Sequence, residues 1–135
     1  MYSTLLYALL GLTSPTASTA AETSPLPEQP GTDIGYPSPE AALKALRVKP
    51  GVSIREENDW YIAQDPGEST IWSITRPSHP AHPSAVKRSF EKRNGTLYLS
   101  MKVDCGSSKE NCDRLVRQFQ ELNAQMVEAM RRKQP

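Results

Sequence analysis

The chain has 135 residues, the usual size of one domain, and carries 16 Lys and Arg side chains against 15 Asp and Glu. This balance excludes a generally basic or acidic protein, so net charge predicts neither nucleic acid nor an anionic membrane surface as a partner. The apolar fraction of 37% is low for a compact domain, and a polar, proline-rich stretch near the N-terminus accounts for much of that shortfall.

Residues 1–21 are predicted to be a signal peptide. An apolar run from Leu5 to Leu12 is followed by small residues that end at Ala20 and Ala21. The run is shorter than the about 20 apolar residues that a membrane-spanning helix needs. No Lys or Arg precedes it, and a membrane anchor is the alternative interpretation. We therefore expect export, with no stable membrane anchor after cleavage.

Residues 22–37, AETSPLPEQPGTDIGY, contain three prolines and few large apolar side chains. Such a segment buries too little surface to offset the entropy that is lost when a chain is ordered. It is predicted to be a flexible tether, which leaves residues 38–135 as a single domain.

A short helix is predicted at the start of this domain. Ser38 suits the capping position, Pro39 suits the first helical position, and Glu40 suits the positive end of the helix dipole. Pro50 and Gly51 predict its end.

Five strands are predicted after this helix. Residues 52–55, 60–63 and 70–76 carry β-type patterns with turn residues between them, and residues 85–93 and 96–103 flank Asn94-Gly95, a strong hairpin signal. In the last strand Leu97, Leu99, Met101 and Val103 alternate with polar residues, which predicts an antiparallel sheet with one covered face.

A long helix over about 109–132 is expected to provide that cover, because its apolar residues recur at helical spacing. Ser107 and Glu110 are interpreted as its capping box. The predicted fold is α+β, a five-stranded antiparallel sheet with a short N-terminal helix and a long C-terminal helix packed on one face.

The two cysteines, Cys105 and Cys112, are predicted to form a disulfide, because an even pair in an exported protein usually does. A loop of this size would stabilise the fold by about 2.5 kcal/mol in the chain-entropy description. A redox-active or metal-binding pair is the alternative, but the C-x6-C spacing differs from C-x-x-C and no histidine lies near in sequence.

The segment PSHPAHPSAVKR contains the only two histidines, His79 and His82. Alternating prolines favour polyproline II, which would place both side chains on the same side with their backbones about 9 Å apart. A metal site needs three or four ligands, so we predict no metal and no cofactor. No nucleophile motif such as G-x-S-x-G is present, and no catalytic residues are predicted.

A stiff connector between two strands is the preferred interpretation of this segment. Prolines pre-order a loop, and the bonds before Pro77, Pro80 and Pro83 are each candidates for the cis form. A pre-ordered loop that carries two imidazoles outward is also a suitable contact surface, since little entropy is lost on binding. Unperturbed imidazoles would titrate near neutral pH.

Basic and aromatic residues extend this candidate surface. Strand alternation separates Lys87 from Arg88 onto different faces, which argues against a nucleic-acid stripe. Tyr98 lies opposite the apolar face of its own strand and is expected to be exposed. The predicted contact residues are therefore His79, His82, Tyr98, Lys87 and Arg88.

Several segments together produce a familiar pattern: Tyr-Pro-Ser-Pro-Glu-Ala-Ala-Leu at 36–43, Thr-Arg-Pro-Ser-His-Pro-Ala-His-Pro at 75–83 after Trp72, Val-Lys-Arg at 86–88, and Cys105 with Cys-Asp-Arg-Leu at 112–115. Over about residues 36–126 the chain resembles small, exported, uncharacterised proteins of Gram-negative bacteria. The resemblance implies a single periplasmic domain and no particular activity.

These patterns predict an exported, periplasmic, non-enzymatic accessory or binding domain. Its expected partner is an envelope or effector protein, bound in the manner of an inhibitor or an immunity protein, and nucleic acid is not expected. A histidine-based metal binder or carrier is the first alternative, and a small periplasmic hydrolase is the second.

Overall fold

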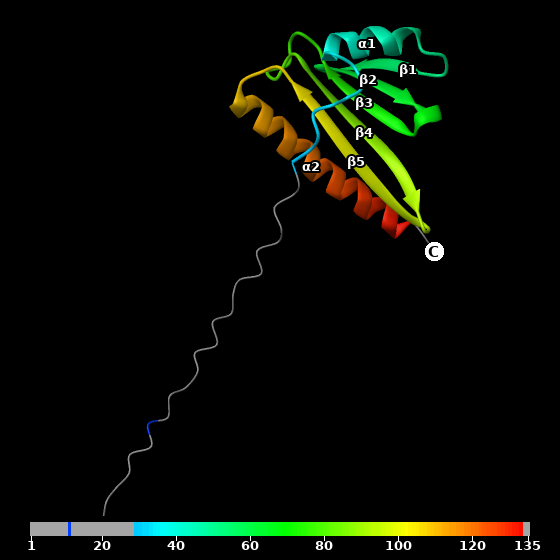
Figure 1. The fold of residues 1–135 in the computed structure, drawn as a ribbon, viewed down its shortest axis with the longest axis vertical. Helices are drawn as coiled ribbons and strands as arrows, with labels where there is room; N and C mark the ends of the chain where they lie inside the picture. The colour runs from blue at the N-terminus through cyan, green and yellow to red at the C-terminus, as the bar shows by residue number, and fades with distance from the viewer. Residues whose placement is uncertain (1–10, 12–28, 134–135) are drawn as a thin grey trace, which may run out of the picture.

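The computed structural model describes residue 11 and residues 29–133. Its elements are the helix α1 (Pro39–Val48), the strands β1 (Ser53–Glu57) and β2 (Trp60–Asp65), a 3-10 turn at Pro66–Glu68, the strands β3 (Thr70–Thr75), β4 (Ser84–Arg93) and β5 (Thr96–Cys105), and the helix α2 (Lys109–Arg132). The predicted α+β class is confirmed, as are the five strands, the short first helix and the long last one (Figure 1).

The five strands form one antiparallel sheet in the order β1-β2-β3-β4-β5, so each strand pairs with its neighbour in the chain. The β4-β5 hairpin turns at Asn94 and Gly95, whose φ angles of 51° and 79° suit a tight two-residue turn. β3 pairs with β4 only as far as Ser89. The hairpin therefore extends beyond the three shorter strands (Figure 1).

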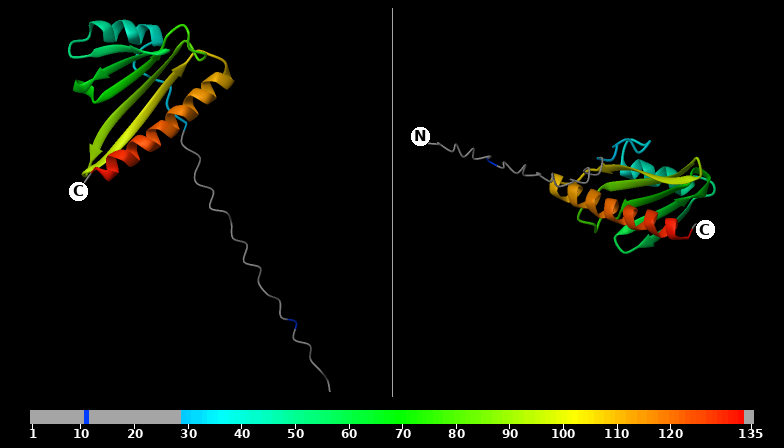
Figure 2. Two further views of the ribbon diagram at one scale, coloured as in Figure 1. Left: turned by 180° about the vertical axis from the view of Figure 1, so that it is seen from behind. Right: turned by 90° about the horizontal axis from the view of Figure 1, so that it is seen from below.

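The two helices cover opposite faces of the sheet. Val86 and Val103 pack with residues of α2, whereas Ala85, the neighbour of Val86 in β4, packs with residues of α1. Successive side chains of a strand point to opposite faces, and the right-hand view of Figure 2 shows one helix on each side of the sheet. The cover by α2 is as predicted, but the prediction of a single covered face is wrong, because α1 packs on the second face.

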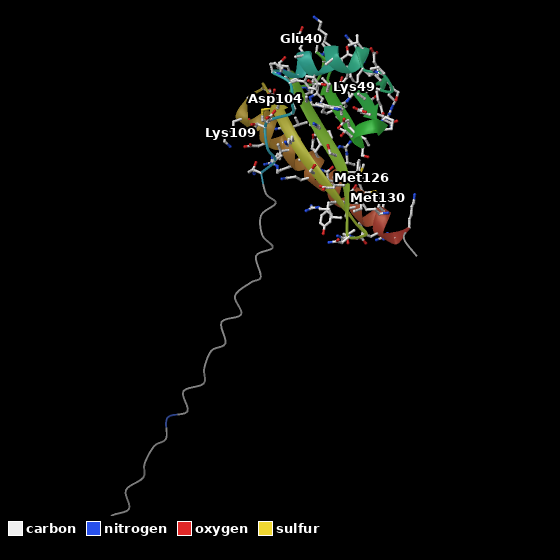
Figure 3. All side chains as sticks on the ribbon, turned by 45° about the vertical axis from the view of Figure 1, so that its right-hand side comes forward. Glu40, Lys49, Asp104, Lys109, Met126 and Met130 are labelled. Atoms are coloured by element: carbon white, nitrogen blue, oxygen red, sulfur yellow. A yellow bond between two sulfur atoms is a disulfide. The ribbon has the colours of Figure 1, made fainter. Side chains whose placement is uncertain are left out.

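The C-terminal half of α2 follows the hairpin to its end. Leu97 of β5 lines a small surface hollow together with Val127 and Met130 of α2, and Met126 and Met130 lie beside this end of the sheet (Figure 3). The apolar residues that alternate along β5 thus pack against the apolar residues that recur at helical spacing in α2.

The predicted boundary between tether and domain is wrong, because the domain begins before residue 38. Gly31 bridges to Lys102, and its carbonyl accepts the N–H of Val103 at 2.8 Å. Ile34 is 1% exposed, and the Tyr36 ring lies 5.8 Å from that of Trp72. These two large apolar side chains pack between α1 and the sheet. Composition alone does not reveal this packing. The predicted signal peptide (apart from residue 11) and residues 22–28 lie outside the described residues.

Each helix begins at a capping serine. The N–H of Ala41 donates to the Ser38 hydroxyl at 3.0 Å, as predicted for α1. In α2 the predicted cap is wrong by one residue, because Ser108 rather than Ser107 accepts the N–H of Asn111, at 3.2 Å.

Within residues 29–133, neither helix combines the length and the apolar character that crossing a membrane requires.

Candidate functional site

The proline–histidine loop, residues 76–83, forms two consecutive turns instead of the expected polyproline II segment. The N–H of His79 donates to the carbonyl of Arg76, and the N–H of His82 donates to that of His79, each at 3.0 Å. Polyproline II has no internal hydrogen bonds, so these turns satisfy backbone groups that it would leave to solvent. Of the three proline bonds considered, His82–Pro83 is cis.

His82 is exposed, and it also anchors this loop. Its Nδ1 lies 3.0 Å from the hydroxyl and 3.2 Å from the carbonyl oxygen of Thr75, at the end of β3. The same hydroxyl accepts the N–H of Ser84 at 2.8 Å, at the start of β4. The connector interpretation is thus supported by contacts at both ends of the loop.

His79 lies against the aromatic core. Its ring centroid is 4.4 Å from that of Trp60, and its Nδ1 accepts the N–H of Ala81 at 2.9 Å. A ring nitrogen that accepts a hydrogen bond carries no proton, so the neutral ring holds its proton on Nε2. Burial lowers the pKa of His79 below its ordinary value, and the nearby carboxylate of Asp59 opposes this shift in part.

The loop is joined to the start of α2. The carbonyl of Pro80 accepts from the Asn111 side chain at 3.1 Å and from the Ser107 hydroxyl at 3.3 Å. The predicted disulfide between Cys105 and Cys112 is confirmed, and it ties the end of β5 to the first turn of α2.

This junction forms a surface that we call the loop–helix corner, made of His79, Pro80, Asn111, Arg114 and Gln118. These residues surround a pocket of about 100 Å³, with Ala81 and Leu115 completing its lining. Arg114 donates to Glu110 at 3.2 Å and remains half exposed. The corner therefore combines hydrogen-bond donors with the exposed ring of Pro80. The disulfide between Cys105 and Cys112 cross-links the end of β5 to α2 at this corner.

Arg88 does not belong to a contact surface, and that part of the prediction is wrong. It is 5% exposed, because α2 covers its face of the sheet. Its guanidinium lies 5.1 Å from the Phe119 ring, Nη1 donates to Asn123 at 3.5 Å, and the buried Nε has no partner in the part of the chain that the structure describes. The desolvation lowers the pKa of Arg88.

Lys87 and Tyr98 lie on the opposite face, away from the loop. The Lys87 ammonium is 5.3 Å from the centre of the Trp72 ring. Tyr98 is 44% exposed, as alternation predicted, and the Arg93 guanidinium stacks 4.0 Å from its ring. The five predicted contact residues therefore do not form one surface, because strand alternation and the length of the hairpin separate them.

A second concave site lies on the α1 side and is called the sheet-face pocket here. It has a volume of about 160 Å³, and its lining includes Tyr36, Lys49, Asp65, Trp72 and Lys87. Lys49 lies at the end of α1 (Figure 3) and donates to Asp65 at 2.6 Å. Sequence reasoning missed this site, because its lining comes from four separated parts of the chain. The only available signal was a pair of large apolar residues, Ile34 and Tyr36, in an otherwise polar segment.

The described part of the chain holds no group of three or more His, Cys, Asp or Glu side chains placed to bind a metal ion.

The chain matches no family model, and neither curated proteins nor solved structures provide a match. The resemblance to exported proteins of Gram-negative bacteria therefore stays a prediction. The geometry of the loop–helix corner and of the sheet-face pocket is the basis for assigning a function.

Proposed function

We propose that the protein is an exported, non-enzymatic accessory domain that binds a protein partner in the cell envelope through the loop–helix corner. The observation that supports this most is the pre-ordering of the corner. The loop is held to β3 by His82, to α2 by Asn111, and to the end of β5 by Gly106, whose N–H donates to Pro83 at 2.8 Å. A surface ordered before binding loses little conformational entropy when a partner docks.

The chemistry of the corner indicates what a partner would present. The Nε2–H of His79 and the guanidinium of Arg114 are donors, and the Pro80 ring is an exposed apolar group beside them. A protein segment with carbonyl or carboxylate oxygens next to an apolar side chain complements this set. Such a partner fits an inhibitor-like or immunity-like role.

Export to the periplasm is part of the proposal. The disulfide between Cys105 and Cys112 supports an oxidising compartment, and the apolar run Leu5 to Leu12 supports a signal peptide. N-terminal sequencing of the protein recovered from the periplasm tests this directly, with cleavage after Ala20 or Ala21 as the expected result. Recovery of the uncleaved chain from the cytoplasm would contradict it.

A histidine-based metal carrier is the weaker alternative. The Nδ1 atoms of His79 and His82 are already engaged, by Ala81 and by Thr75, so each ring offers only Nε2 to a metal ion. Calorimetry with Zn²⁺ and Cu²⁺ separates the two proposals. A stoichiometric heat that disappears in the double variant His79→Ala/His82→Ala would favour the carrier. A hydrolase would instead require an activity that one Ser, Asp or His substitution abolishes.

Site-specific photo-crosslinking tests the binding proposal. A photoreactive residue replaces Gln118 in the corner, and Lys44 on the exposed side of α1 serves as the matched control position. We expect one crosslinked protein of defined mass from position 118 in the periplasm and none from position 44. Adding His79→Ala should reduce the yield. Equal crosslinking from both positions, or none from position 118, would contradict the assignment.

A further inference from the structure

The sheet-face pocket is independent of the loop–helix corner, because it opens on the other face of the sheet. Its floor is the indole of Trp72, which is 3% exposed, and the ring of Tyr36 tilts toward it with 5.8 Å between centroids. Tyr36 belongs to the N-terminal segment, which packs over the sheet beside α1 (Figure 1). The pocket is therefore a built feature of the domain, and its lining combines two aromatic rings with charged side chains.

One wall of the pocket carries an ion pair, in which the two charges neutralise each other. The Lys49 ammonium donates to the Asp65 carboxylate at 2.6 Å, and the Asp65 side chain is 5% exposed. The hydrogen bond to Asp65 raises the pKa of Lys49, so the Lys49 ammonium stays charged near neutral pH. This wall shapes the pocket but contributes little net charge to a ligand.

Lys87 is the lining cation that forms no ion pair among the described residues, and its ammonium lies 5.3 Å from the centre of the Trp72 ring. Its partner across the strands is Lys102, and like charges placed directly opposite each other in a sheet are destabilising. The carboxylates around them, Glu68 in the pocket lining and Asp104 two residues along β5, form no ion pair with either lysine among the described residues. A local positive charge thus lies beside an aromatic floor, which is the chemistry that attracts an anion with an apolar body.

We infer that the sheet-face pocket binds a small organic carboxylate that carries one ring, with the carboxylate paired to Lys87 and the ring against Trp72 and Tyr36. The pocket volume of about 160 Å³ is close to the about 150 Å³ of a cavity that accommodates benzene. The ligand is either a free aromatic carboxylate or the C-terminal residue of a peptide, because both present the same group on the same kind of body.

Amide NMR spectra of the purified full chain test this inference, with phenylacetate as the probe and its uncharged amide, phenylacetamide, as the matched ligand control. A ligand of about ten non-hydrogen atoms is expected to bind with a dissociation constant of about 1 mM. We expect saturable shifts at Tyr36, Trp72 and Lys87, and at least about tenfold weaker binding of the amide, because it lacks the charge. No saturable shift, or equal binding of both compounds, would overturn the inference.

Three variants locate the site. Lys87→Met removes the ammonium and keeps an unbranched side chain, and Tyr36→Leu removes the ring but keeps an apolar group. Both should weaken phenylacetate binding about tenfold or more, while Lys92→Met, an exposed position on the other face of β4, should leave it unchanged. Retained binding in both pocket variants would refute the site. The dispersed amide spectrum of each variant reports that it is folded.

Two peptides distinguish the sources of the carboxylate. Acetyl-Ala-Phe is compared with its C-terminal amide and with phenylacetate on the same protein. Tighter binding of the peptide acid by at least about tenfold assigns the pocket to a peptide C-terminus, whereas equal or weaker binding assigns it to a free carboxylate. The result is independent of the crosslinking test, because that test probes residues on the other face of the sheet.

Discussion

Replacing Arg88 by methionine is expected to make the protein more stable, although it removes a charged residue from a well-packed interface. Arg88 lies between β4 and α2 and is 5% exposed. Within the described ranges its Nε has no hydrogen-bond partner, and its side-chain hydrogen bond to Asn123 has a length of 3.5 Å. Among residues 29–133 no carboxylate pairs with it.

The magnitude follows from three contributions. A buried donor without a partner costs about 1–3 kcal/mol, and Arg88→Met removes that cost. The variant loses the attraction between the guanidinium and the Phe119 ring, 5.1 Å away, which contributes about 1 kcal/mol. It also loses the long hydrogen bond to Asn123, which contributes about 0.5 kcal/mol at most because of its length. Methionine keeps the unbranched apolar stem, so the central values of these contributions give a rise in the free energy of unfolding of about 0.5 kcal/mol.

Urea unfolding followed by tryptophan fluorescence and circular dichroism measures this change. The unfolding midpoint should move to higher urea at constant slope, and the melting temperature should rise by about 2–4 °C for a domain of this size. Lys92→Met is the control, because it removes an exposed charge from the same face of β4 and should change stability by less than about 0.5 kcal/mol. Destabilisation of Arg88→Met by about 1 kcal/mol or more would refute the reasoning, since the guanidinium would then have a stabilising partner.

Three further changes should each lower stability. Replacing Cys105 and Cys112 by alanine removes a constraint on the unfolded chain and should cost about 2.5 kcal/mol in chemical unfolding. Burial lowers the pKa of His79 below 6.5, so the native state binds fewer protons than the unfolded state. The contribution of His79 to stability is complete above pH 6.5 and is lost as the pH falls toward the native pKa. His79→Gln should abolish this pH dependence, which a pH series of melting temperatures measures. Gly106→Ala places a Cβ 3.0 Å from the Pro83 ring and 3.1 Å from its carbonyl oxygen, and should cost about 1–3 kcal/mol.

Each of these three predictions has its own control. The cysteine variant is compared with the wild type under reducing conditions, where the difference should vanish. An unchanged pH profile in His79→Gln would contradict the role given to that ring. Gly67→Ala is the control for Gly106, because a Cβ at Gly67 would meet Asp65 only at 3.6 Å. Equal stability of the two alanine variants would show that Pro83 can move aside at no cost.

Local patterns accounted for most of the fold. The alternation of Leu97, Leu99 and Met101 predicted the strand and its covered face, and Asn94-Gly95 predicted the turn, because both features depend on neighbouring residues only. The capping residue of α2 was misplaced by one position. Two adjacent serines are equivalent in sequence, and only the orientation of the loop decides which of them reaches Asn111.

The candidate sites were harder to predict from the sequence than the fold was. His79 was identified as a contact residue, but its partners Asn111 and Arg114 lie more than thirty residues away and were not. Polyproline geometry was expected from the alternating prolines, whereas hydrogen bonds within the loop favoured two turns. The sheet-face pocket was missed altogether, because Tyr36 was assigned to a tether.

The sequence by itself determined the number and order of the strands, the two helices and the disulfide partners, since periodicity, turn residues and a single cysteine pair suffice for these. The tertiary structure decided which helix covers which face, and with that the burial of Arg88 and the entry of Ile34 and Tyr36 into the core. The physical reason is that alternation distinguishes the two faces of a strand without specifying what packs on either. Burial, and the pairing of charges, depend on segments that are distant in the chain.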